Sequence, residues 1–232
     1  MKNFLPSLIE VPFGNYYKKC ATLLFNSGFN SFHIDFGDKL LIKRKILPWE
    51  KIDFLKSLGN NLKLTAHIMC KSGDHDGSIE KVTKECLRYN FETIYVHTSS
   101  FEDLNYFKLF INKFFSKNIE ILGIASEIVS PNNHELIELI NEANIQKFLQ
   151  MGVLIGSGGQ LFNPNSLNNL NNILINCPKV NYLELDGGLT KNVLKDLTNS
   201  KINSFSGWSI IAHEDPEVVV KNAIELKRLY LQ

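Results

Sequence analysis

The chain has 232 residues, of which 44% are hydrophobic and 21% are charged, and its formal net charge is +1. This length can supply a full hydrophobic core, and the near-neutral charge excludes strong electrostatic recruitment to nucleic acid or an acidic membrane. Pro6, Glu10 and Pro12 interrupt the apolar N-terminus before a signal sequence or membrane span could form, so we expect a cytoplasmic protein. We expect the scattered cysteines to be reduced structural thiols; they are Cys20, Cys70, Cys86 and Cys177.

Eight short apolar or alternating segments recur along the chain, each followed by a longer segment of helical period. No linker rich in proline, glycine or serine divides them. This rhythm predicts an α/β fold, a single (β/α)8 TIM barrel spanning residues 1–232, with its site at the carboxyl ends of the strands. The predicted strands lie near residues 3–9, 30–36, 62–69, 93–97, 119–125, 147–154, 180–186 and 202–207.

Polar side chains share one face on three of these segments. In SFHIDFGD at 31–38, His33 and Asp35 point to the same side, opposite the apolar side chains. His67 lies near the end of the third predicted strand, and Asp186 ends the seventh. In a closed barrel these strand ends converge, so the four side chains are expected to meet. Two imidazoles and two carboxylates suit one divalent ion, Zn²⁺, Fe²⁺ or Mn²⁺.

Four motifs in order resemble the ribulose-phosphate 3-epimerase family: HID on the second predicted strand, AHIM on the third, MGVLIGSGGQLFNP from the sixth and LELDGG on the seventh. LPSLIE near the N-terminus also resembles that family's first strand. The resemblance implies a barrel of the ribulose-phosphate-binding type whose metal ligands are His33, Asp35, His67 and Asp186. It also implies that Asp35 and Asp186 form the acid/base pair. From it we expect an isomerase and a homo-oligomer.

The implied reaction is metal-dependent epimerisation of a ketose phosphate at C3, by default D-ribulose 5-phosphate to D-xylulose 5-phosphate. Removing a proton from one face and returning one to the other requires two flanking acid/base groups. A divalent ion would offset the charge of the enediolate formed between these steps. The residues expected to bind the sugar phosphate are Ser7, Met69, Met151, Gly158, Gly159, Gly187, Gly188, Gly207 and Trp208. The glycine pairs are expected to offer free backbone N–H groups to the phosphate.

Departures from the family pattern affect substrate recognition. After the second predicted strand the chain reads GDKLLIKR, so Gly37 replaces a methionine while an aspartate, Asp38, remains. Ser157 replaces a phenylalanine, and Trp208 stands where the family has a phosphate-contacting serine. We therefore expect Gly37 and Ser157 to open room and Trp208 to reshape the phosphate end of the pocket. The alternatives are an epimerase acting on a different keto-sugar phosphate and a catalytically silent sugar-phosphate-binding paralogue. A related decarboxylase is disfavoured because LTAHIMC lacks the lysine of that group.

Three further segments carry plainer expectations. KSGDHDGS at 71–78 offers Asp74, His75 and Asp76 as ligands, but a polar mobile loop is the preferred interpretation. KRK at 43–45 is expected to form a solvated face, and the Asn-rich tract near 163–176 to form the sixth helix with a polar outer face. Glu184 shares the interior face of its strand, where an ion pair with Lys63 would be an ordinary structural feature.

Overall fold

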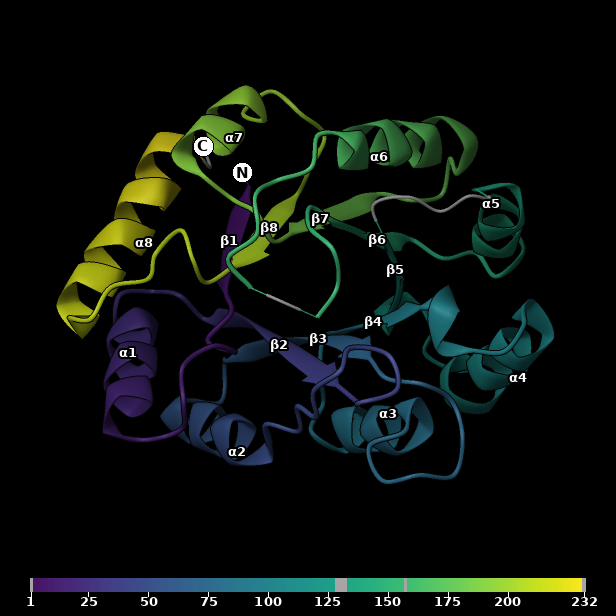
Figure 1. Cartoon of the computed structure of the whole chain (residues 1–232), viewed down its shortest axis with the longest axis horizontal. Coiled ribbons are helices and arrows are strands. Elements are labelled where there is room, and N and C mark those ends of the chain that lie inside the picture. Colours follow the sequence, from purple (N-terminus) through teal and green to yellow (C-terminus); the bar gives the residue numbers. More distant parts are fainter. Residues whose placement is uncertain (1, 128–132, 157, 231–232) are drawn as a thin grey trace.

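The computed structural model describes residues 2–127, 133–156 and 158–230. Its eight parallel strands form one sheet in the order β1-β8-β7-β6-β5-β4-β3-β2. A parallel bridge between Ser7 and His33 joins the two edge strands, so the sheet closes into a barrel (Figure 1). The strands are β1 (Asn3–Pro6), β2 (Ser31–Gly37), β3 (Lys63–Met69), β4 (Thr93–His97), β5 (Leu122–Ser126), β6 (Lys147–Met151), β7 (Tyr182–Asp186) and β8 (Ser204–Gly207).

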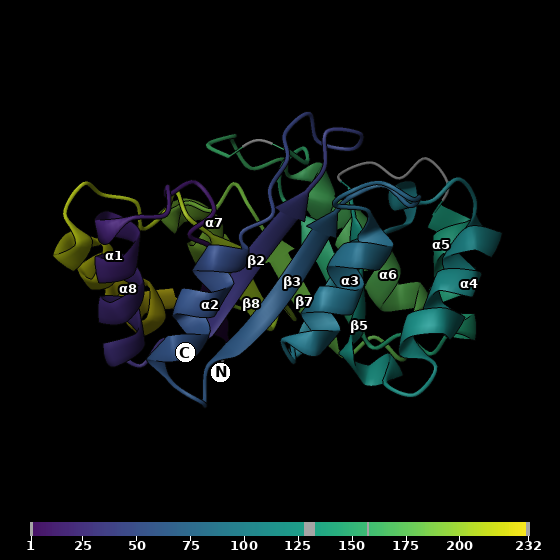
Figure 2. The same ribbon diagram turned by 90° about the horizontal axis from the view of Figure 1, so that it is seen from below.

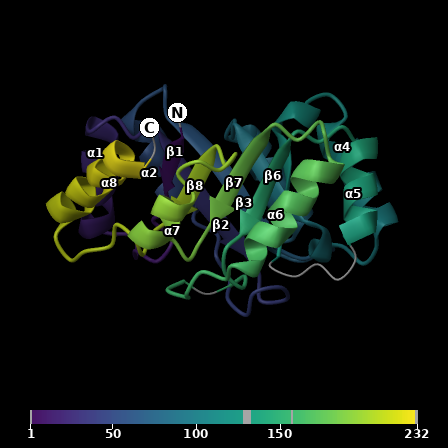
Figure 3. The same ribbon diagram turned by 90° about the horizontal axis from the view of Figure 1, so that it is seen from above.

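Helices alternate with the strands and cover the outside of the barrel, as Figures 2 and 3 show from two sides. Hydroxyl and carboxylate caps begin two of them: Asp103 accepts from two backbone N–H groups of α4, and Thr190 accepts from one of α7. The helices are α1 (Asn15–Asn26), α2 (Trp49–Leu58), α3 (Ile79–Arg88), α4 (Leu104–Phe115), α5 (Asn133–Glu142), α6 (Asn165–Asn176), α7 (Lys191–Asp196) and α8 (Pro216–Tyr230).

The predicted (β/α)8 barrel is confirmed, with differences at the element boundaries. Each predicted strand is present, and the Asn-rich tract forms α6 as expected. The apolar residues 119–121 form a short 3₁₀ helix before β5 rather than part of the strand. β6 ends at Met151, and the next carbonyl, that of Gly152, accepts a hydrogen bond from Asn163 in the following loop. Apolar character alone therefore placed these boundaries too far out.

Side-chain alternation divides the barrel into an apolar outer layer and a polar interior. Phe32 and Phe36 of β2 are buried in the large apolar cluster that includes side chains of the helices. His33 and Asp35, between them in sequence, are buried on the opposite, interior face. The four cysteines are buried free thiols, as expected. In the described ranges, no helix is both long and apolar enough to cross a bilayer.

Candidate active site and metal centre

The four predicted metal ligands meet at the carboxyl ends of three strands. His33 and Asp35 come from β2, His67 from β3 and Asp186 from β7, and one donor atom of each lies within 4.8 Å of the others. Asp35 Oδ1 lies 3.0 Å from His67 Nδ1 and 3.4 Å from His33 Nε2. Asp186 Oδ2 lies 3.6 Å from His67 Nδ1 and 3.9 Å from His33 Nε2. The barrel thus brings together donors that are distant in sequence.

These donors fit a divalent ion. Metal–ligand bonds of about 2.0–2.1 Å in a tetrahedral site place the ligand atoms roughly 3.3 Å apart. The observed distances of 3.0 to 3.9 Å surround that value. His33 Nε2 is also buried, and none of the described residues forms a hydrogen bond with it. A buried nitrogen without a partner is costly unless something absent from the protein chain occupies the position, and a cation would satisfy it.

A second layer of buried side chains orients the two imidazoles. His33 Nδ1 lies 2.7 Å from Glu184 Oε1, which leaves His33 Nε2 facing the other donors. His67 Nε2 lies 2.7 Å from Nε2 of His97, which leaves His67 Nδ1 facing the carboxylates. His97 was missed from the sequence, although the alternation in TIYVH places it on the interior face at the end of β4. Such second-layer partners fix the tautomer and orientation of metal-binding histidines.

The expected ion pair between Glu184 and Lys63 is wrong. Lys63 begins β3, so its amino group lies at the opposite end of the barrel from the site, where its side chain is about half exposed. There it pairs with Glu92 at 2.6 Å. Glu184 instead belongs to the layer that holds His33.

The two aspartates are held in different electrostatic environments. Burial alone would raise the pKa of Asp35, but His33 and His67 beside it hold that pKa well below its usual range. Burial raises the pKa of Asp186, with His33 opposing the rise and Asp35 adding to it. Burial disfavours the charged form of His33, yet Asp35 and Asp186 outweigh burial and raise its pKa well above the usual value. The carboxylates therefore favour opposite protonation states, an arrangement suited to acid/base catalysis.

Each aspartate is also anchored by a serine hydroxyl. Ser7 Oγ donates to Asp35 Oδ2 at 2.9 Å, and Ser206 Oγ donates to Asp186 Oδ1 at 2.8 Å. The other oxygen of each carboxylate is the one that lies nearest the imidazoles. Ser7, expected to bind substrate, lines the cavity and at the same time fixes Asp35.

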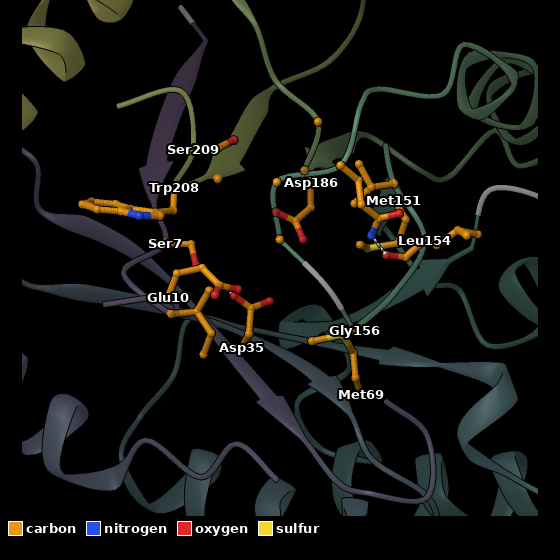
Figure 4. A pocket seen from close by; sticks show the side chains of 18 of the residues that line it. Ser7, Glu10, Asp35, Met69, Met151, Leu154, Gly156, Asp186, Trp208 and Ser209 are labelled. Atoms are coloured by element: carbon orange, nitrogen blue, oxygen red, sulfur yellow. Dashed lines mark hydrogen bonds between the residues drawn. The ribbon is translucent and has the colours of Figure 1, made fainter. Parts of the chain in front are cut away.

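A solvent-open cavity with about 740 Å³ of empty space lies above the cluster, and Asp35 and Asp186 face it from different sides (Figure 4). Its volume suits a small metabolite. Met69 and Met151 are buried and line the cavity, consistent with the expected floor. All the predicted substrate-binding residues line this cavity, namely Ser7, Met69, Met151, Gly158, Gly159, Gly187, Gly188, Gly207 and Trp208.

The second glycine pair differs from expectation. The N–H of Gly187 donates to the carbonyl of Ser206 at 3.2 Å, so it is not free to meet an anion. Gly188 has a φ of +70°, and a Cβ there would lie 2.7 Å from the backbone of Phe162. Glycine is therefore required at this position by close backbone packing, whatever else it does.

The residues thought to reshape the pocket are also placed differently. The indole of Trp208 extends away from Asp35 and Asp186 and packs, partly buried, against the apolar layer outside the barrel (Figure 4). Gly37 opens no room, because a Cβ there would lie 2.1 Å from Cδ1 of Ile42, which occupies the space. Ser157, the third such position, lies outside the described residues.

Asp38 anchors the loop that carries Ile42. Its Oδ1 accepts from the N–H groups of Leu40 and Leu41, and its Oδ2 accepts from the N–H of Lys71 at 2.6 Å. Figure 2 shows the loops after β2 and β6 projecting beyond the strand ends, and Ile42 packs closely against Gly156 of the second loop.

The alternative ligand set in the loop at 71–78 does not assemble. His75 Nε2 lies 3.1 Å from Asp38 Oδ2, Asp74 pairs with Lys81, and Asp76 pairs with Lys45. The three side chains therefore bind three separate partners. Lys45 belongs to the KRK segment, whose central residue, Arg44, lines the cavity instead of forming part of a solvated face.

Comparison with known proteins agrees with the motifs. No curated protein matches the chain significantly. KGPDC from Streptococcus mutans superimposes with a TM-score of 0.65 at 14% identity over 100% of both chains. Phosphoribosyl anthranilate isomerase from Thermus Thermophilus gives a TM-score of 0.60 at 14% identity, covering 98% of this chain and 99% of the other. Such identities show a shared fold alone, but the sequence profile of the Ribulose-phosphate 3 epimerase family matches residues 3–211, so the chain belongs to that family.

Proposed function

We propose that this protein is an isomerase that epimerises a ketose phosphate at C3, with D-ribulose 5-phosphate to D-xylulose 5-phosphate as the default reaction. The observation that carries the proposal is the placement of Asp35 and Asp186. They face one cavity from β2 and β7, beside a donor set that fits a divalent ion. Family membership supports the same reaction class.

In this mechanism the two aspartates act on opposite faces of the sugar. Asp35, ionised beside two imidazoles, takes the proton from C3, and the electron pair of that C–H bond moves into the enediolate. Asp186, whose pKa burial raises, donates a proton to the other face of C3. One C–H bond breaks and one forms, so the reaction needs no oxidant or reductant. The reverse reaction exchanges the two functions.

His33, Asp35, His67 and Asp186 would hold the divalent ion, Zn²⁺, Fe²⁺ or Mn²⁺. When bound, this ion supplies electrostatic stabilisation for the negative charge that develops on the oxygens at C2 and C3. Glu184 and His97 keep the imidazole nitrogens turned toward that position. Met69 and Met151 limit water on the floor of the cavity, which strengthens electrostatic interactions there.

A phosphorylated sugar is the substrate class supported best. Another solved structure of the Streptococcus mutans KGPDC, with a TM-score of 0.67 and 15% identity, is described as a complex with a sugar phosphate. The altered loop after β2 and the occupied N–H of Gly187 favour a second candidate, the same reaction on a ketose phosphate of different length or stereochemistry. Complete retention of the donor set argues against a silent binding protein.

Deuterium exchange tests the proposal. The metal-loaded protein is incubated in D₂O with pentulose, hexulose and longer ketose phosphates, and deuterium at C3 is followed by NMR. Asp35→Asn and Asp186→Asn should each lower turnover by about 10²- to 10⁴-fold, with metal content measured in every variant. Asp74→Asn, an exposed aspartate at the barrel rim, is the matched control. No exchange with any ketose phosphate, or near-normal turnover by a metal-replete Asp186→Asn protein, would contradict the mechanism.

A further inference from the structure

Two loops place an ion pair at the wall of the cavity. Arg44, in the loop after β2, donates from Nη2 to Oε1 of Glu10, in the loop after β1, at 2.8 Å. Both residues line the cavity, and Glu10 lies beside Asp35 in Figure 4. Their side chains are 43% and 35% exposed, respectively. An ion pair this accessible to water is only weakly held, so either partner can be exchanged for another ion at little cost.

The same glutamate oxygen lies against the first glycine pair. A Cβ at Gly158 would lie 2.8 Å from Glu10 Oε1, so the carboxylate sits where the backbone of that pair is exposed to the cavity. A carboxylate at this position would repel a phosphate dianion unless a cation is close. Arg44 is that cation, because it contacts the same oxygen.

Both loops are held in place by buried or partly buried contacts. Lys51 Nζ donates to the carbonyls of Leu8 and Ile9 at 3.1 Å, which fixes the backbone just before Glu10. Asp38 and Ile42 fix the loop that carries Arg44. The guanidinium is therefore positioned by the fold over the cavity, and its local partner is a carboxylate that a stronger anion can replace.

We propose that Arg44 binds the phosphate of the substrate, and that Glu10 holds Arg44 in place until the phosphate takes over. This inference rests on the proposed function for the identity of the substrate. A guanidinium presents two parallel N–H donors that match phosphate oxygens, and a dianion outcompetes a single carboxylate. Arg44 thereby supplies a charge contact in a pocket where the N–H of Gly187 is already used and a family serine is replaced by Trp208.

Calorimetric titration of the metal-loaded protein with ribulose 5-phosphate, unphosphorylated ribulose and inorganic phosphate tests this assignment. Arg44→Met should raise the Kd for ribulose 5-phosphate and for phosphate by about 10- to 100-fold, and leave ribulose binding unchanged. Glu10→Gln should lower both phosphate-dependent Kd values severalfold, because it removes the competing anion. Lys43→Met, an exposed neighbour of Arg44 outside the cavity lining, is the charge-matched control and should change neither.

A purely structural latch between the loops gives a different result. Both Arg44→Met and Glu10→Gln would then weaken binding in the same direction and to the same extent for phosphorylated and unphosphorylated sugar. That pattern, or a wild-type protein that binds neither phosphate nor ribulose 5-phosphate, overturns the inference. Deuterium exchange is recorded on the same samples, so a protein that binds phosphate through Arg44 but never exchanges at C3 refutes the epimerase proposal alone.

Discussion

Replacing Glu184 with glutamine should weaken metal binding about tenfold without unfolding the barrel. Glu184 Oε1 lies 2.7 Å from His33 Nδ1, and both side chains are at most 1% exposed. Glutamine keeps the shape of the side chain and an oxygen that can accept this hydrogen bond, but it loses the charge. The imidazole is then oriented by a neutral acceptor.

The magnitude follows from the difference between the two hydrogen bonds. A hydrogen bond to a charged group contributes about 1.5–3 kcal/mol, and a neutral one about 0.5–1.5 kcal/mol. The difference of roughly 1–1.5 kcal/mol corresponds to about tenfold in affinity. Glu184→Leu removes the acceptor completely and should reduce the affinity by about 100-fold, the upper part of the range for second-layer partners of metal-binding histidines.

Competition with a chromophoric chelator measures these affinities on the metal-free protein for Zn²⁺ and Mn²⁺. Glu92→Gln is the matched control, because it removes the same charge from an exposed pair with Lys63 at 2.6 Å. Thermal unfolding of each variant reports folding separately. An affinity of folded Glu184→Gln within twofold of wild type, or a larger loss in Glu92→Gln, would refute the orientation argument.

Three further changes test the surroundings of the site. His97→Phe should weaken metal binding about 10- to 100-fold in the same assay, whereas His97→Gln, which still accepts from His67, should bind nearly normally. Asp38→Ala should free the loop it caps, seen as faster tryptic cleavage after residues 43–45. Burial lowers the pKa of Lys51 from 10.5 to about 8, so the folded chain binds fewer protons than the unfolded chain between these values. Relative to Lys51→Met, wild-type stability should therefore rise by about 1–2 kcal/mol from pH 7 to 10 in urea titrations, a value discounted for partial exposure; a flat difference would contradict this.

The barrel and the donor set were predictable because they depend on periodicity and closure. Alternation in 31–38 fixes His33 and Asp35 on one face, and parallel closure brings the ends of β2, β3 and β7 together whatever the loops do. His97 obeys the same rule at the end of β4 and could have been included. Its omission reflects attention to residues that matched a family motif.

The loop contacts could not be predicted from periodicity. Gly37 appeared to open space, yet the loop after β2 returns over the barrel and places Ile42 there. The same return brings Arg44 to Glu10, although 34 residues separate them in the chain. The path of this loop depends on four hydrogen bonds and ion contacts of one side chain, Asp38, and on packing against Gly156, which no local pattern encodes.

This difference has a chemical consequence. The donors for the metal stand on strands and are fixed by buried partners such as Glu184, so changes in the loops leave their geometry intact. The cavity wall stands on loops whose anchors, Asp38 and Lys51, lie away from the donor set. Substitutions at Arg44 should therefore change which anion is bound while metal affinity stays constant, and substitutions at Glu184 should do the reverse. Proton transfer and substrate choice can then vary independently in this barrel, because different structural elements hold the groups responsible for each.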